Sequence, residues 1–250
     1  MSAHIEITVE DRVQTLRMNR PDKKNAIDRA MYAAMAEALR RADADPEIRA
    51  TLIAGVPGAF SAGNDIADFV AIATAGQPTS EVTSFIEALA TGTKPIVAAV
   101  DGLAIGIGTT MLMHCDIVLA SPRSVFRTPF LDLGLVPEAG SSLLGPRLMG
   151  VRRAYALLVL GEVFDADAAL DADLVTRLVD ADAVEAEAFA AAKALASKPP
   201  EALAIGRDLL RGPREELLER IAVELKHFGE RLTSAEARAA FMAFMSKSKG

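Results

Sequence analysis

Two loops rich in small residues could place main-chain N–H groups close to a ligand. Residues 58–65 follow the apolar run 51–54, and residues 102–110 follow the apolar run 95–100. Each loop resembles the start of a helix, where main-chain N–H groups lack partners and small side chains allow a ligand to approach. Two such N–H groups that converge on one oxygen would form an oxyanion hole. Ordinary strand-to-helix turns have the same spacing, and this pattern alone favours that simpler interpretation.

Glu138 is the candidate acid–base group. Its neighbours include the apolar residues Val136, Pro137 and Ala139. Burial among them would raise the pKa of the carboxyl from its ordinary value of about 4.3, because burial disfavours the charged form. A general base works best when its pKa lies near the working pH. A carboxylate here could instead stabilise the start of a helix over residues 139–149, and the residues alone favour that second role.

A dinucleotide-binding site is disfavoured by what surrounds the second loop. Residues 101–108 contain the Gly-x3-Gly-x-Gly spacing of some reductases. Those reductases also place a lysine four residues after a catalytic tyrosine. Here Tyr32 and Tyr155 are followed at that distance by Ala36 and Val159, and no βαβ context with an acidic residue supports the motif.

The sequence predicts no metal site, hydrolase nucleophile or P-loop. His4, His114 and His227 are scattered, and Cys115 is the single cysteine, so a zinc site lacks its usual ligand spacing. The glycine before Ser61 stands one place too early for a Gly-x-Ser-x-Gly elbow. We expect His114 and Cys115 to lie in the core or behind the site, because the segment around them is apolar.

Composition narrows the classes of partner. The 250 residues contain 27 Lys and Arg against 34 Asp and Glu, a net charge of −7. This acidity argues against nucleic acid or an anionic membrane as the main partner. Aromatic residues make up only 5% and Trp is absent, so a base-stacking surface is also disfavoured. No signal peptide or membrane span is apparent, and we expect a cytoplasmic protein.

The elements that must position these residues alternate between strand and helix patterns. The sequence predicts a hairpin over residues 5–10 and 13–19, and a helix over 29–42 capped by Asp28. It also predicts buried strands at 51–54, 95–100 and 116–120, and a helix that ends near Gly92. Further helices are expected at 143–149, 152–160, 183–196, 201–210, 215–232 and 235–245. Together these predict a parallel-type α/β core with a helical C-terminal region, divided into residues 1–197 and 198–250.

Five motifs occur in a fixed order along nearly the whole chain. They are Arg20-Pro21 with Asn25-Ala26, residues 59–66 (AFSAGNDI), residues 94–102 (KPIVAAVDG), Cys115-Asp116-Ile117 and residues 134–142 (GLVPEAGSS). In this order they resemble the crotonase (enoyl-CoA hydratase/isomerase) superfamily. The resemblance implies a spiral of ββα units, an acyl-CoA thioester substrate and a homotrimer or hexamer. Coenzyme A would belong to the substrate, with no separate cofactor, and region 198–250 would serve trimerisation and closure of the active site.

The resemblance also assigns the site residues. The main-chain N–H groups of Asn64 and Ile107 fall at the oxyanion positions, although Asn64 replaces a residue that is often small and Ile107 replaces a glycine. Lys24 and Ala26 are expected near the CoA nucleotide, within local positive charge from Arg20, Lys23 and Lys94. Substrate contacts are expected at Ala62, Gly63, Asp65, Ile66, Gly106, Gly108 and Phe130. Phe241, Phe244 and Lys247 fall where the family's last helix can close over CoA or a neighbouring subunit, although helical spacing alone would place both Phe residues in the core.

Departures from the family pattern point to one reaction. The two glutamates of family hydratases are replaced by Thr110 and Phe130, neither of which can act as an acid or base at neutral pH. Glu138 stands at a third family position. This is similar to the isomerase branch, in which one carboxylate moves a proton from C2 to C4 as a 3-enoyl-CoA becomes a 2-enoyl-CoA. The alternatives are hydration or another crotonase reaction driven by Glu138, Asp65 or Asp132, and a non-catalytic acyl-CoA-binding member.

Overall fold

The computed structural model describes residues 2–65, 68 and 80–247, and its centre is a six-stranded sheet. The strand order is β1-β2-β3-β5-β7-β10, with β1 antiparallel to β2 and the remaining neighbours parallel. The predicted hairpin and the three predicted buried strands are all present in this sheet. Its strands are β1 (Ile5–Glu10), β2 (Val13–Met18), β3 (Ala50–Ala54), β5 (Ile96–Val100), β7 (Ile117–Ala120) and β10 (Arg177–Leu178).

A second, four-stranded sheet was not predicted, and two of its strands lie inside the two small-residue loops. Its order is β4-β6-β8-β9, and β4, β6 and β8 are parallel. The strands are β4 (Ala59–Ser61), β6 (Leu103–Ile105), β8 (Val125–Arg127) and β9 (Phe164–Asp165). In each of the successive pairs β3–β4, β5–β6 and β7–β8, the first strand belongs to the large sheet and the second to the small sheet. This repetition produces the predicted spiral of ββα units.

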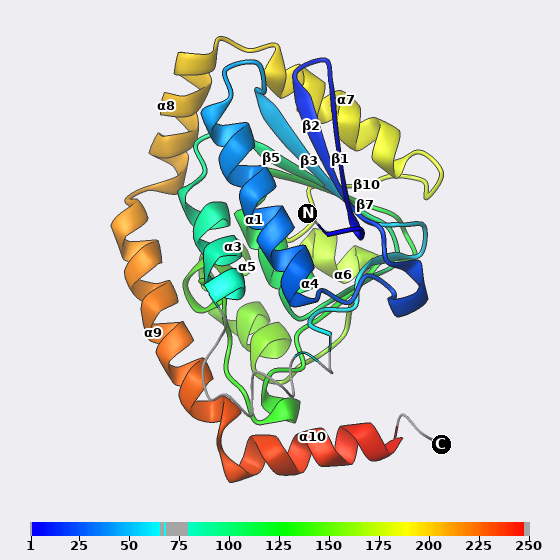
Figure 1. Cartoon of the computed structure of the whole chain (residues 1–250), viewed down its shortest axis with the longest axis vertical. Coiled ribbons are helices and arrows are strands. Elements are labelled where there is room, and N and C mark those ends of the chain that lie inside the picture. Colours follow the sequence, from blue (N-terminus) through cyan, green and yellow to red (C-terminus); the bar gives the residue numbers. More distant parts are fainter. Residues whose placement is uncertain (1, 66–67, 69–79, 248–250) are drawn as a thin grey trace.

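Helices cover both faces of the larger sheet (Figure 1). Asp28 caps the first of them as predicted, because its side chain accepts a hydrogen bond from the Met31 amide at 2.8 Å. The two helical segments predicted on either side of Gly150 are both present within α5, because Gly150 itself has non-helical dihedral angles (φ 75°, ψ 157°) and separates them by a kink. The helices are α1 (Arg29–Ala44), α3 (Ser80–Thr91), α4 (Ile107–Thr110), α5 (Ser141–Leu158), α6 (Ala166–Asp171), α7 (Val184–Ala196), α8 (Pro200–Arg211), α9 (Arg214–Leu232) and α10 (Ala235–Lys247), with 3-10 turns at Pro21–Lys23, Met111–His114 and Leu131–Leu133.

Alternation along the strands divides the core into two layers. Leu52 and Val97 pack with the alanine-rich helix α7 on one face of the sheet. Ile53 and Ala98, each one residue further along, belong to the main core with α1 and α3 on the other face. Successive side chains of a strand point to opposite faces, so one strand can supply both layers.

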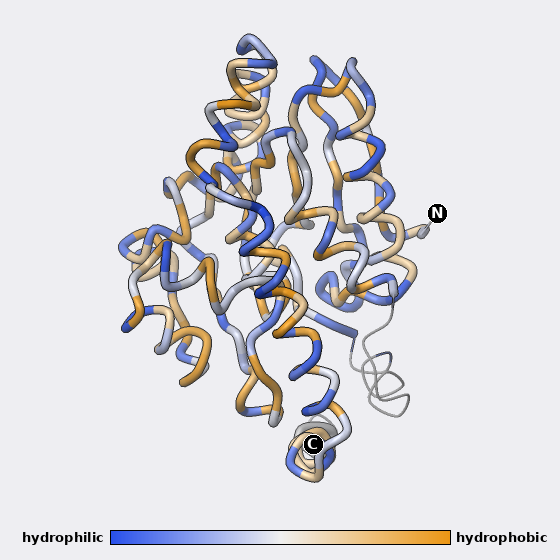
Figure 2. The backbone as a smooth tube through the Cα atoms, turned by 90° about the vertical axis from the view of Figure 1, so that its left-hand side faces the viewer, coloured by the Kyte–Doolittle hydropathy of each residue, from blue (hydrophilic) through white to orange (hydrophobic). Residues whose placement is uncertain are grey.

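The C-terminal helices lie along one side and one end of the molecule. Figure 1 shows α8 and α9 descending one side and α10 crossing the bottom. Figure 2 shows hydrophobic and hydrophilic residues alternating along α9, which buries Ile221, Phe228 and Leu232 on one face. The predicted division at residues 197/198 falls between α7 and α8. Within the described residues, no helix combines the length and the apolar character that crossing a membrane requires.

Candidate active site

The two small-residue loops meet because their strands are neighbours. Strands β4 and β6 pair in parallel, so the loops that follow them leave the same edge of the small sheet. Gly63 has a φ of 85°, and a Cβ there would lie 2.8 Å from the Ile105 carbonyl oxygen. A Cβ on Gly108 would lie 2.9 Å from the Ser61 Cβ. Any larger residue at these two glycines would therefore push the loops apart.

The amides of Asn64 and Ile107 are available as hydrogen-bond donors. Ile27 holds the first loop on both sides of Asn64, since its amide donates to the Gly63 oxygen at 2.7 Å and its oxygen accepts from the Asp65 amide at 2.9 Å. Ile107 is the first residue of α4, where a helical amide has no partner within the helix. Across the described part of the chain, neither of these two amides donates a hydrogen bond.

A cavity of about 660 Å³ lies beside both loops. Aromatic side chains close it: Phe130 from the turn after β8, Phe228 from α9 and Phe241 from α10. The predicted substrate-contact residues that border it are Ala62, Gly63, Gly106 and Phe130, and Asn64, a predicted oxyanion residue, borders it too. The structure thus brings four predicted contact residues and one predicted oxyanion residue together, and α10 supplies one wall through Phe241.

Glu138 is buried and tied to the helix that carries Ile107. Its side chain is 5% exposed, and its Oε1 accepts a hydrogen bond from the Thr110 hydroxyl at 2.6 Å. Burial raises the pKa of Glu138 to about 8; the Thr110 bond lowers this pKa and the negative charge of Glu224 raises it. Leu133 and Leu135 of the segment that precedes Glu138 border the cavity, whereas Glu138 and Ile107 are not among the described residues that line it. The second predicted role of Glu138, at the start of a helix, fits its position just ahead of α5.

Thr110 and Tyr32 are two site residues whose roles the sequence did not indicate. The sequence indicated only that Thr110 replaces a hydratase glutamate. The Tyr32 hydroxyl donates to the Asn64 Oδ1 at 2.6 Å, from a side chain that is 2% exposed. Burial, followed by the negative charge of Glu138, raises the pKa of Tyr32 well above its ordinary value. Tyr32 continues the apolar face of α1, so its spacing predicts only a core residue.

The predicted CoA-binding segment runs beside the first loop. The Lys24 oxygen accepts from the Ala62 amide at 2.9 Å, and the Ala26 oxygen accepts from the Arg20 Nη1 at 2.9 Å. The side chains of Lys23 and Lys24 are exposed.

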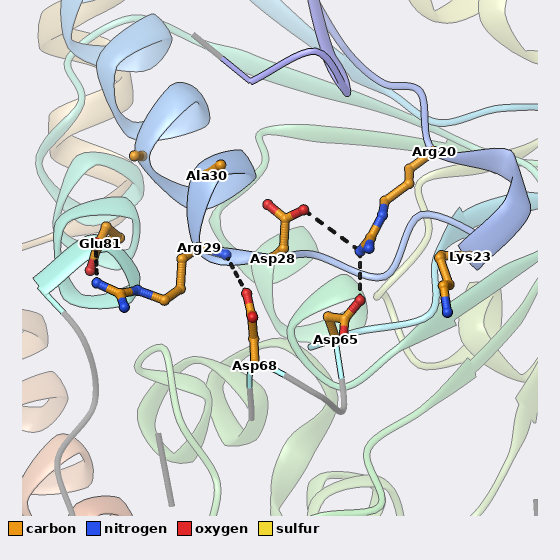
Figure 3. Close-up of a pocket in the computed structure, with 9 residues that line it drawn as sticks. Arg20, Lys23, Asp28, Arg29, Ala30, Asp65, Asp68 and Glu81 are labelled. Carbon is orange, nitrogen blue, oxygen red and sulfur yellow. Dashed lines mark hydrogen bonds and ion pairs between the residues drawn. The ribbon is translucent and has the colours of Figure 1, made fainter. Parts of the chain in front are cut away.

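Arg20 and Lys94 are engaged within the protein. Figure 3 shows Arg20 between Asp28 and Asp65, with Nη1 to Oδ2 distances of 3.7 and 2.7 Å. Lys94 donates to the Ala42 oxygen at 2.6 Å, at the C-terminal end of α1. Lys23 and Lys24 therefore remain as the candidate cations for a phosphate group.

The remaining predicted residues lie around the two loops or outside the cavity. Gly108, in α4, has its backbone close to Ser61 of β4. Asp132 pairs with Arg127 at 2.8 Å beside the cavity. His114 is buried as expected, with its Nε2 2.7 Å from the Ala139 oxygen, and burial lowers its pKa to about 4. Ile66 lies outside the described residues, as do the side chains of Phe244 and Lys247.

The sequence over residues 8–250 matches the enoyl-CoA hydratase/isomerase family. The chain belongs to this family. It is similar to the crystal structure of an enoyl-CoA hydratase/isomerase from Pseudoalteromonas atlantica T6c, with a TM-score of 0.92 and 40% identity over 98% of this chain and 97% of the other. These findings confirm the resemblance to the crotonase superfamily and its fold.

The curated relatives include proteins named as isomerases and proteins named as probable enoyl-CoA hydratases. Human (Homo sapiens) enoyl-CoA delta isomerase 2 is 34% identical over 96% of this chain and 63% of the human protein. The chain therefore spans just under two thirds of that relative's length. The 1,2-epoxyphenylacetyl-CoA isomerase of Escherichia coli (strain K12) is 31% identical over 96% of this chain and 94% of the bacterial protein.

Proposed function

We propose that this family member is an acyl-CoA-processing enzyme that converts 3-enoyl-CoA to 2-enoyl-CoA, with Glu138 as its single proton shuttle. The supporting observation is a buried carboxyl with a pKa of about 8, joined through Thr110 to the same helix that begins at the Ile107 amide. The reaction is a proton transfer without change of oxidation state. It therefore needs no cofactor beyond the CoA that the substrate carries.

The proposed reaction has two proton transfers. The Glu138 carboxylate removes a proton from C2, and the electron pair moves onto the thioester oxygen to give an enolate. The amides of Asn64 and Ile107 stabilise this oxygen, where negative charge appears only as the reaction proceeds. The protonated Glu138 then returns the proton to C4, the carbonyl re-forms, and the double bond lies between C2 and C3.

The surroundings of Glu138 suit this role. With a pKa of about 8, the carboxylate is a stronger base than an exposed glutamate and still ionises near neutral pH. Its 5% exposure limits exchange of the captured proton with water. The residues at the two hydratase positions, Thr110 and Phe130, supply no second carboxylate to activate water. The name of the human relative agrees with this choice, whereas the E. coli relative is named for isomerisation of an epoxide and further relatives are named as probable enoyl-CoA hydratases.

The test follows a deuterium label from C2. We expect purified protein to convert a 3-enoyl-CoA deuterated at C2 into the conjugated thioester, with part of the label recovered at C4. Absorbance follows the conjugation and mass spectrometry with NMR locates the label. Formation of 3-hydroxyacyl-CoA from a 2-enoyl-CoA, without isomerisation, would instead establish a hydratase. Calorimetric binding of CoA thioesters without turnover would establish a non-catalytic member.

The wider expectations of the family are proposals for this chain. Lys24 and Ala26, with Lys23, would bind the CoA nucleotide beside the first loop. Region 198–250 would close the site and contribute to a homotrimer or hexamer. Leu209 and Leu210 on α8 are 79% and 91% exposed, and apolar surface of this kind is typical of interfaces. Sedimentation of the purified protein measures the assembly, and localisation in the cytoplasm remains a prediction.

A further inference from the structure

Tyr32 and Asn64 form a contact between the first long helix and the first loop. Tyr32 lies in α1, and its ring packs against Phe85 of α3 with centroids 5.6 Å apart. Its hydroxyl reaches out of this apolar environment to the Asn64 Oδ1 at 2.6 Å. A buried hydroxyl needs such a partner, because burying it unpaired costs free energy. The core of α1 and α3 therefore fixes one side chain of the site.

The direction of this hydrogen bond determines what Asn64 can offer. The raised pKa of Tyr32 keeps the phenol protonated, so it can donate to Oδ1. The Asn64 amide group then has its Nδ2 donors left over, and no described residue accepts from them. Asn64 also borders the cavity. Its side chain can thus supply a donor in addition to its main-chain N–H.

We propose that Tyr32 is a positioning residue that acts through Asn64 on the enolate oxygen, an inference that rests on the proposed isomerisation. By holding Oδ1, Tyr32 orients Nδ2 as a third donor beside the amides of Asn64 and Ile107 and steadies the loop that carries the first of them. Donors that are already oriented stabilise developing charge without reorganisation. Loss of the phenol hydroxyl therefore weakens transition-state stabilisation more than substrate binding.

The experiment is a double-mutant cycle of Tyr32→Phe and Asn64→Ala on isomerisation of a 3-enoyl-CoA. We expect each variant to lower kcat about tenfold with KM within about twofold, since small misplacements of reacting groups are costly. The double variant should be no slower than either single variant, because both changes remove the same contact. Tyr155→Phe is the matched control: Tyr155 is 55% exposed on α5, and its removal should leave kcat unchanged.

A pH profile provides a readout that a purely structural role would not produce. The pKa of Glu138 responds to burial, Thr110 and Glu224, so Tyr32→Phe should lower kcat without moving the midpoint near pH 8. A lower melting temperature with kcat retained, or multiplicative losses in the double variant, would overturn the inference. If Tyr32→Phe fails to fold, Asn64→Ala alone decides, and full activity there would overturn it.

The two proposals fail in different ways. Wild-type protein that does not isomerise 3-enoyl-CoA overturns the proposed function, and the positioning role falls with it. Wild-type protein that isomerises, together with a Tyr32→Phe variant of equal kcat, overturns only the positioning role.

Discussion

Two buried carboxyl groups near the N-terminus of α5 differ in how many donors hold them. Glu138 and Glu224 are each 5% exposed. Glu138 accepts from the Thr110 hydroxyl. Glu224, from α9, accepts from the Gly140 amide at 2.6 Å, and from both the amide and the hydroxyl of Ser142.

The difference separates a carboxyl suited to proton transfer from one suited to holding a helix. Burial raises the pKa of both groups, but three hydrogen bonds at Glu224 oppose that rise, against one at Glu138. Glu224 also satisfies main-chain amides at the start of α5, which otherwise lack partners. The arrangement attaches the C-terminal region to the segment that carries Glu138.

The variant Glu138→Gln tests whether Glu138 is the carboxyl that transfers the proton. The amide cannot remove a proton, so we expect kcat for isomerisation to fall by about 10²- to 10⁴-fold. Rates measured at saturating 3-enoyl-CoA check this. The control is the fold: circular dichroism should be unchanged, because the amide oxygen can still accept from Thr110. Isomerisation at the wild-type rate would remove Glu138 from the mechanism.

The same variant should also change how the free energy of unfolding depends on pH. The pKa of Glu138 rises from an ordinary 4.5 to about 8 on folding, so the folded state holds the proton more tightly. Wild-type stability should therefore fall as pH rises from about 4.5 to about 8, in the part due to this group. Urea unfolding at several pH values should show a weaker decline in Glu138→Gln; an equal decline would contradict the burial of the charge.

Glu224→Ala probes the other carboxyl. It leaves the Gly140 and Ser142 amides without their acceptor, and we expect a loss of about 1–3 kcal/mol in the free energy of unfolding. Glu216→Ala is the matched control on α9, since its salt bridge with Arg147 is exposed and should be worth less than about 1 kcal/mol. Equal losses of stability in the two variants would show that Glu224 does not hold the start of α5. Chemical denaturation measures both.

The smallest expected effect is a shift in the pH profile. The Thr110 hydroxyl lowers the pKa of Glu138, so Thr110→Val should move the ascending limb of kcat/KM to higher pH. Thr110→Ser keeps a hydroxyl and should leave the limb near that of the wild type. A downward shift in Thr110→Val, or the same shift in both variants, would show that this hydrogen bond does not lower the pKa of Glu138.

Local patterns predicted the parts of the fold that local physics determines. The Asp28 cap, the hairpin and the strands of the large sheet all follow from capping chemistry and periodicity. The small sheet was missed because β4, β6 and β8 have only three residues each, too few for a period to show. Its pairing comes from tertiary packing between segments about 20 to 40 residues apart.

In the site, too, some features follow from the sequence and others come only from tertiary packing. The family motifs selected Glu138 and the two amides as candidates, since motifs record position along the chain. They did not indicate that Thr110 would contact Glu138, 28 residues away, or that Tyr32 would contact Asn64, 32 residues away. They also did not indicate that Arg20 would form an ion pair with Asp65, 45 residues away. Such contacts depend on how helices and sheets pack, which residue type and spacing leave undetermined.

Helix α4 is a single turn of four residues, with Ile107 at one end and Thr110 at the other. Any displacement of this turn moves the Ile107 amide, which we propose binds the enolate oxygen, together with the hydroxyl that contacts Glu138. Under that proposal, engineering toward a different reaction would have to adjust both ends of the turn together or replace the turn.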